Sequence, residues 1–176
     1  MATDLRYPDG LAASHAAPRR GLHANAGLVS IVVLGALMLA ALSGVLAGAR
    51  STARVVEAPA ARIVVQTPER LRNGEFFETR LSVTARADIA DATIAVPATL
   101  WRDMTINTMI PAAGEEAFQD GAFRFRYGPL KADDTLELKF DGQINPPLTL
   151  GTSGEFALYD GDRRLGAVPM RIRVLP

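Results

Sequence analysis

The chain begins with a polar segment and continues into a long stretch that carries no charge. Residues 21–49 contain no Asp, Glu, Lys or Arg, and residues 27–48 are apolar except for Ser30 and Ser43. A helix over residues 27–48 extends about 33 Å at ~1.5 Å per residue. That length is enough to cross a hydrocarbon core of about 30 Å. The pattern therefore predicts one transmembrane helix over residues 27–48.

A cleaved signal peptide is the alternative interpretation of this segment. Residues 47–49 read Ala-Gly-Ala, which is a pattern that signal peptidase accepts. However, the apolar stretch is longer than a typical signal sequence, and a polar segment precedes it. We therefore expect a disordered cytoplasmic tail over residues 1–26, the span over 27–48, and a linker over 49–60. The large domain that follows is expected on the far side of the membrane, because long segments translocate largely regardless of charge.

After residue 60 the apolar positions recur at every second residue. Phe77, Leu81 and Val83 share one parity, whereas Arg80 and Ser82 share the other. Such alternation is typical of strands with one buried face. The same pattern predicts strands over residues 123–127, 136–140 and 168–174, with shorter strands over 62–66, 92–96, 105–110 and 155–159.

Turn-forming pairs separate these segments and complete the fold prediction. One-sided alternation argues against a parallel sheet, whose strands are apolar on both faces. We therefore expect an all-β domain over residues 61–176, an immunoglobulin-like antiparallel β-sandwich of about seven or eight strands, preceded by one transmembrane α-helix. The predicted turns are Asn73-Gly74, Asp120-Gly121, Gly128-Pro129, Asp141-Gly142 and Asp160-Gly161.

Part of the domain resembles a known family. Asn73-Gly74-Glu75 leads into the strand over 77–86, and Leu130-Lys131-Ala132-Asp133-Asp134 leads into the strand over 135–140. These blocks resemble bacterial immunoglobulin-like modules of the CARDB and conserved-repeat type, over about residues 62–145. The chain departs from that pattern at Asp133-Asp134, where the family has a glycine turn, and at Ala87-Asp88, where it has Asn-Gly. The resemblance implies a non-enzymatic spacer or binding unit.

The composition removes several kinds of chemistry. The chain has no cysteine, and both histidines, His15 and His23, precede the predicted span. The domain therefore lacks the usual base and thiol nucleophiles, so we expect no enzyme activity and no cofactor. The formal net charge is zero, which gives no electrostatic reason to expect a nucleic-acid partner. Arginine outnumbers lysine 17 to 2, which suggests a bacterial source.

Metal binding is a weaker interpretation of the remaining residues. A blue-copper site needs two histidines and a cysteine, so Met104, Met109 and Met170 are the only soft ligands left in the domain. We expect these methionines to pack rather than to bind copper. Carboxylates could bind calcium, but Asp133-Asp134, Asp160 and Asp162 lie where turns are expected.

Two features point to a protein partner. The segment around Trp101 holds the only tryptophan together with Arg102, Met104 and Met109, and these residue types are enriched at interfaces. The alternative is that Trp101 packs at the end of the sandwich. Within the predicted span, small residues recur every four positions, a spacing that allows close helix packing in lipid. These residues are Ala36, Ala40, Gly44 and Gly48.

The sequence as a whole predicts a single-pass accessory or scaffold subunit of a bacterial inner membrane. Its partners would be the lipid bilayer and an integral membrane protein, bound through the helix and the periplasmic domain. Two other functions remain open: a periplasmic assembly factor for a metal or redox enzyme, and a cell-envelope ligand-binding module.

Overall fold

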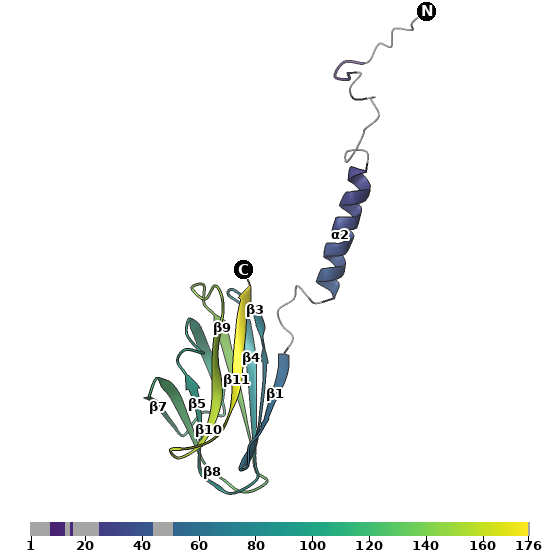
Figure 1. Ribbon diagram of the computed structural model, residues 1–176. Coiled ribbons are helices and arrows are strands. Elements are labelled where there is room, and N and C mark those ends of the chain that lie inside the picture. Colours follow the sequence, from purple (N-terminus) through teal and green to yellow (C-terminus); the bar gives the residue numbers. More distant parts are fainter. Residues whose placement is uncertain (1–7, 13–14, 16–24, 44–50, 176) are drawn as a thin grey trace, which may run out of the picture. The chain divides into compact units, whose positions relative to one another are not determined.

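The computed structural model describes residues 8–12, 15, 25–43 and 51–175, which belong to two separate units, 1–46 and 47–176. In the first unit, helix α2 spans Ala26–Leu42 and buries none of its side chains (Figure 1). Within the part of the chain that the structure describes, no helix is both long and apolar enough to cross a membrane. The predicted span continues over residues 44–48, which lie outside the described residues.

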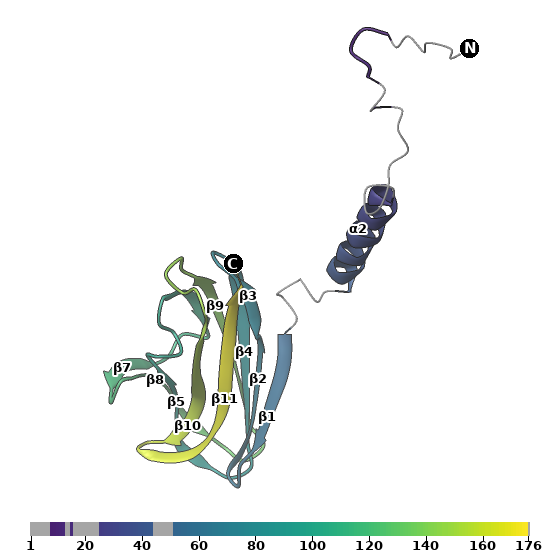
Figure 2. The ribbon, with the colours of Figure 1, turned by 45° about the horizontal axis from the view of Figure 1, so that its top comes forward.

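The second unit is a sandwich of two β-sheets (Figures 1 and 2). One sheet has the strand order β1-β2-β4-β9-β6, and the other has the order β3-β11-β10-β5-β8-β7. The strands are β1 (Ser51–Glu57), β2 (Ala61–Pro68), β3 (Arg70–Arg72), β4 (Phe76–Ala85), β5 (Ile89–Pro97), β6 (Met104–Ile110), β7 (Glu115–Gln119), β8 (Ala122–Leu130), β9 (Thr135–Ile144), β10 (Thr152–Asp160) and β11 (Arg163–Leu175).

The strand order is that of the immunoglobulin fold with additions. In that fold, strands A, B, E and D form one sheet, and C, F and G form the other. Here β2, β4, β9 and β6 take the first set of positions, and β5, β10 and β11 take the second. The β7–β8 hairpin is inserted in the chain between the strands at positions D and E, and β8 pairs with β5. The sequence prediction of a β-sandwich is therefore confirmed.

Three strands were not expected, and one of them pairs in parallel. The predicted linker over residues 49–60 contains β1, which pairs with β2 along its whole length. Strand β3 runs parallel to β11, so the second sheet is mixed rather than purely antiparallel. Strand β7 is exposed at every position and therefore has no apolar alternation to reveal it.

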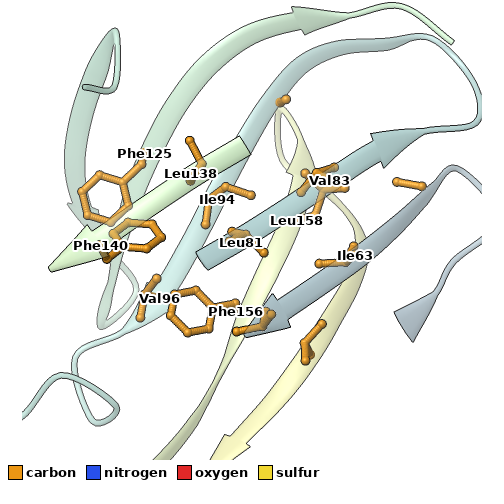
Figure 3. Packing of buried hydrophobic residues seen from close by; sticks show 14 of the residues in the cluster. Ile63, Leu81, Val83, Ile94, Val96, Phe125, Leu138, Phe140, Phe156 and Leu158 are labelled. Carbon is orange, nitrogen blue, oxygen red and sulfur yellow. The ribbon is translucent and has the colours of Figure 1, made fainter. Parts of the chain in front are cut away.

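The core lies between the two sheets and follows the predicted parity. Leu81 and Val83 from one sheet meet Ile94 and Leu158 from the other, and all four side chains are almost fully buried (Figure 3). The alternating residues of β11 are buried in the same way at Val168, Met170, Ile172 and Val174. Met170 is therefore a packing residue, as expected.

Two of the predicted turns are wrong because tertiary contacts override the local signal. Gly142 lies inside β9, where a Cβ atom would stand 2.7 Å from Cζ of Phe77. The glycine makes room for the ring of Phe77 and does not form a turn. Gly128 lies inside β8 at a φ of 80°, opposite a shift of register with β5, which is a β-bulge.

Candidate functional site

A groove on one side of the sandwich holds three of the four residues predicted to bind a partner from the domain. It has a volume of about 420 Å³ and contains Trp101, Met104 and Met109. Its other lining residues are Ile106, Asn107, Thr108, Glu116, Phe123 and Phe125. The structure thus joins residues from β6, β7, β8 and the loop before β6 into one site.

The remaining predicted residues lie elsewhere. Arg102 is exposed and does not line the groove, and its Nε atom lies 3.7 Å from Oδ2 of Asp103. Ala36 and Ala40 lie on helix α2, which buries no side chain in the structure. Gly44 and Gly48 lie outside the described residues, so the small-residue stripe stays a prediction.

The groove is open because both of its walls are sheet edges. Strand β6 ends the first sheet and pairs only with β9, while β7 ends the second sheet and pairs only with β8. An edge strand presents unpaired backbone N–H and C=O groups. The groove therefore combines an apolar floor with two backbone edges that can accept another strand.

Trp101 forms the inner part of this floor. Its ring centroid lies 5.8 Å from Phe123, 5.7 Å from both Phe125 and Phe140, and 6.4 Å from Phe156. Aromatic pairs at these separations attract each other beyond simple burial. The tryptophan is half-buried and packs against the main core, so it closes the end of the core and also faces the groove.

Met109 is held in place by a tyrosine. The hydroxyl of Tyr127 lies 3.0 Å from the sulfur of Met109, and both side chains are half-buried against the core. Burial raises the pKa of Tyr127 to about 12, and the charge of Glu116 adds to the shift. The phenol is therefore neutral at physiological pH and can donate to the sulfur, an ordinary weak acceptor.

Sequence reasoning missed the outermost part of the site. Phe118 on β7 is 63% exposed, and its ring centroid lies 5.1 Å from that of Phe123. The ring of Phe123 in turn contacts that of Trp101, so a row of aromatic rings extends from the surface to the core. Phe123 shares the parity of a buried residue, yet it lies at the open edge. Phe118 is the one large apolar residue of β7, which is the signal that could have identified it.

Ion pairs fix the hairpin that carries these rings. Arg126 on β8 donates to Glu115 of β7 at 2.6 Å, and its Nε atom lies 2.7 Å from Asp91 of β5. The hydrogen bond with Glu115 and the charge of Asp91 raise the pKa of Arg126. These ion pairs tie β7 to the centre of the sheet through β8 and β5.

The polar residues that line the groove are Asn107, Thr108 and Glu116. Among residues 8–12, 15, 25–43 and 51–175, no cluster of three or more His, Cys, Asp or Glu side chains could hold a metal ion.

Comparisons with known proteins give no family. No family model matches the chain, and no curated protein matches it. Among solved structures, the chain is similar to the RrgA Jo.In complex, with a TM-score of 0.46 and 12% identity over 70% of this chain and 83% of that one. It is also similar to a non-cellulosomal cohesin from Archaeoglobus fulgidus, with a TM-score of 0.38 and 7% identity over 73% of this chain and 93% of that one. The resemblance to CARDB modules is therefore not supported by a match to a family model.

Proposed function

We propose that this chain is a non-enzymatic accessory subunit of a bacterial inner membrane. In this proposal, its helix anchors it as a single-pass protein with the N-terminus in the cytoplasm. Its periplasmic domain docks onto an integral membrane protein by taking an extended apolar segment of that partner into the groove. The observation that carries the proposal is the aromatic and methionine-lined groove between two sheet edges.

The kind of occupant follows from the groove's walls. An extended peptide adds to a sheet edge through backbone hydrogen bonds, while its alternate side chains enter pockets beside that edge. Strand β6 supplies such an edge, and Trp101 with Met109 supplies an adaptable apolar floor. A helix of the partner would leave the edge backbone N–H and C=O groups of β6 without hydrogen bonds to the partner.

The membrane part of the proposal rests on the first unit. The described helix carries no charged residue, and Ser30 within it and Ser43 directly after it both bond to carbonyls of the helix. Ser30 Oγ donates to Ala26 O, and Ser43 Oγ donates to Ala40 O, each at 2.8 Å. Polar groups satisfied within a helix are compatible with lipid. Ala36, Ala40, Gly44 and Gly48 would then contact a helix of the partner.

A site-specific crosslink tests the docking. Because the chain has no cysteine, Asn107→Cys can carry a single photoactivatable group inside the groove. In native membranes we expect one adduct, formed with an integral membrane protein, and no equivalent adduct from Thr52→Cys on β1. Equal labelling from both positions, or recovery of the chain in the soluble fraction, would overturn the proposal.

Two matched variants show whether the aromatic rings contribute. Phe118→Ser removes an exposed ring at the groove, whereas Phe76→Ser removes a ring of similar exposure on β4. Truncation of an interface hot spot costs about 2 kcal/mol or more, so we expect roughly tenfold or greater loss of the adduct for Phe118→Ser. The Phe76→Ser variant should retain it.

A further inference from the structure

Three arginines of the domain stand apart from all its other basic residues. Arg70, Arg171 and Arg173 have no ion-pair, hydrogen-bond or ring partner for their side chains within residues 51–175. Every other described Arg or Lys of the domain has one. These three arginines therefore have no partner within the described domain and are free to contact an external anion.

The strand pairing brings these arginines together. Arg173 on β11 is directly opposite Arg70 on the parallel strand β3. Arg171 is two residues before Arg173 and therefore shares its face. All three side chains are exposed, while the neighbouring residues Leu71 and Ile172 are buried. The outer face of the sheet thus has a basic patch, here called the arginine surface.

The nearby carboxylates are already engaged. Glu69 accepts from the Nε atom of Arg54 at 2.7 Å, and Glu75 accepts from the backbone N–H of Arg72 at 2.6 Å. Glu155 is paired with Arg164 at 2.8 Å. No carboxylate of the described domain residues lies within ion-pair distance of the arginine surface, so its positive charge remains available.

An exposed apolar side chain stands beside this charge. Arg171 and Arg173 border a hollow of about 370 Å³, together with Leu150 and Ser153. Leu150 is 88% exposed, the most exposed large apolar residue of the domain's described part. The next residue, Gly151, has a φ of 102°, and a Cβ atom there would lie 2.1 Å from the carbonyl oxygen of Ile172. Only a glycine lets the loop that carries Leu150 lie against β11.

The arginine surface lies at the end of the domain where the chain enters it. Ser51, the first residue of β1, pairs with Pro68, and Arg70 follows two residues later. Figure 1 shows β3 at the same end, beside β11 and the C-terminus. Only residues 49 and 50 separate the predicted span from Ser51, a distance of at most about 11 Å in a fully extended chain.

We propose that Arg70, Arg171 and Arg173, with Leu150, bind the anionic headgroups of the bilayer that holds the anchor. This inference rests on the membrane anchoring of the proposed function but not on the groove. Anionic lipid attracts basic residues near the surface, and each arginine contributes roughly a fivefold gain in binding. The apolar leucine enters the headgroup region, as the apolar residues of surface-bound segments do. The contact would fix the orientation of the domain on the membrane.

The test uses the full-length chain labelled at Thr149→Cys with an environment-sensitive fluorophore, since no other cysteine is present. The protein is reconstituted in phosphatidylcholine nanodiscs with and without phosphatidylglycerol. We expect a blue shift only with the anionic lipid, and its loss in roughly 0.5 M salt, where charges are screened beyond about 4 Å. The triple variant R70Q/R171Q/R173Q should show no shift. A matched variant, R62Q/R86Q/R164Q, removes three paired arginines and should behave as the unchanged chain.

The remaining outcomes separate the proposals. Equal shifts in both nanodiscs, or in both triple variants, would overturn the role of the arginine surface. A response to inorganic phosphate in phosphatidylcholine nanodiscs would show a phosphate site instead of a lipid surface. If the chain does not co-elute with nanodiscs, the anchor is refuted. The labelled chain is then mixed with phosphatidylglycerol vesicles, where the arginine surface should still bind roughly 100-fold better than in the R70Q/R171Q/R173Q variant, and equal binding would refute it.

Discussion

The two sides of the sandwich are closed in different ways. On one side, β1 and β2 of the first sheet pack against β11 of the second, and small residues make the contact. Ala58 is buried there, and a Cβ atom on Gly166 would lie 3.1 Å from its Cβ atom. On the other side, β6 and β7 end their sheets, and the groove that both strands line also contains Trp101 and Phe123.

This difference shows how a sandwich can keep a binding groove without losing its core. Small residues let two sheets approach until no space remains, whereas large rings hold the sheet edges apart. The rings on the open side are nevertheless anchored, because Trp101 contacts both exposed Phe123 and buried Phe140. The open side is therefore a continuation of the core rather than a gap in it.

The largest expected effect comes from removing the ring that joins the groove to the core. Trp101→Ala should lower the free energy of unfolding by about 3 kcal/mol, the lower end for a buried aromatic residue, because the ring is only half-buried. Trp101→Phe should retain more than half of that stability. Denaturant unfolding of the full-length protein in detergent, followed by circular dichroism of the β-sheet, measures both.

The opposite result for Trp101→Ala would break the comparison. If Trp101→Ala costs less than about 0.5 kcal/mol, the usual effect of a surface substitution, then the ring belongs to the surface alone. The open side would then be separate from the core. Phe118→Ser serves as the reference for a ring that is exposed, and it should leave the unfolding free energy almost unchanged.

Adding one methyl group to each side sharpens the comparison at a smaller scale. Gly166→Ala on the closed side places a Cβ atom 3.1 Å from Ala58 and 3.2 Å from Ile63, so we expect a loss of about 1 kcal/mol. Gly114→Ala on the open side meets only the carbonyl oxygen of Arg126 at 3.6 Å and should be neutral or slightly stabilising. Equal losses in thermal unfolding would show that both sides are packed alike.

The last prediction concerns the ionisation of Tyr127 beside the groove. Burial raises its pKa to about 12, above the value of about 10 for an unfolded chain. Its stabilising contribution is therefore complete below pH of about 10 and is lost as the pH rises toward 12. Ultraviolet titration of tyrosinate should show one late step that Tyr127→Phe abolishes. A late step that survives in this variant would assign it to another tyrosine.

The sequence predicted the strands that bury one face in the core. It missed the strands that depend mainly on pairing with a neighbouring strand. The alternation at Phe77, Leu81 and Val83 follows directly from contact with one core, so the pattern was readable. Strand β1 has an exposed Val55 and depends on pairing with β2, and β3 has the single buried residue Leu71. The apolar pattern of neither segment differs from that of a loop. Each forms a strand because it pairs with another strand, and that pairing cannot be seen in its own residues.

The candidate site was partly predictable for a similar reason. Residue type identified Trp101, Met104 and Met109 as a partner-binding set, and the structure places them in one groove, although their binding of a partner stays a prediction. Phe118 and the β7 edge were missed because their proximity to Trp101 arises from the register of the β7–β8 hairpin. The expected turn at Asp141-Gly142 failed because Phe77 occupies the space above Gly142.

The parallel pairing of β3 with β11 also sets the order in which the domain can form. It joins Arg70 to Arg173, so more than half of the chain must be synthesised between the two partners. Contacts of such long sequence separation form slowly, and strand edges that await them are prone to aggregate. A nascent chain would therefore form the antiparallel pairs of β2, β4 and β9 before β11 is available. The arginine surface would be assembled only when β11 arrives, as the last event of folding.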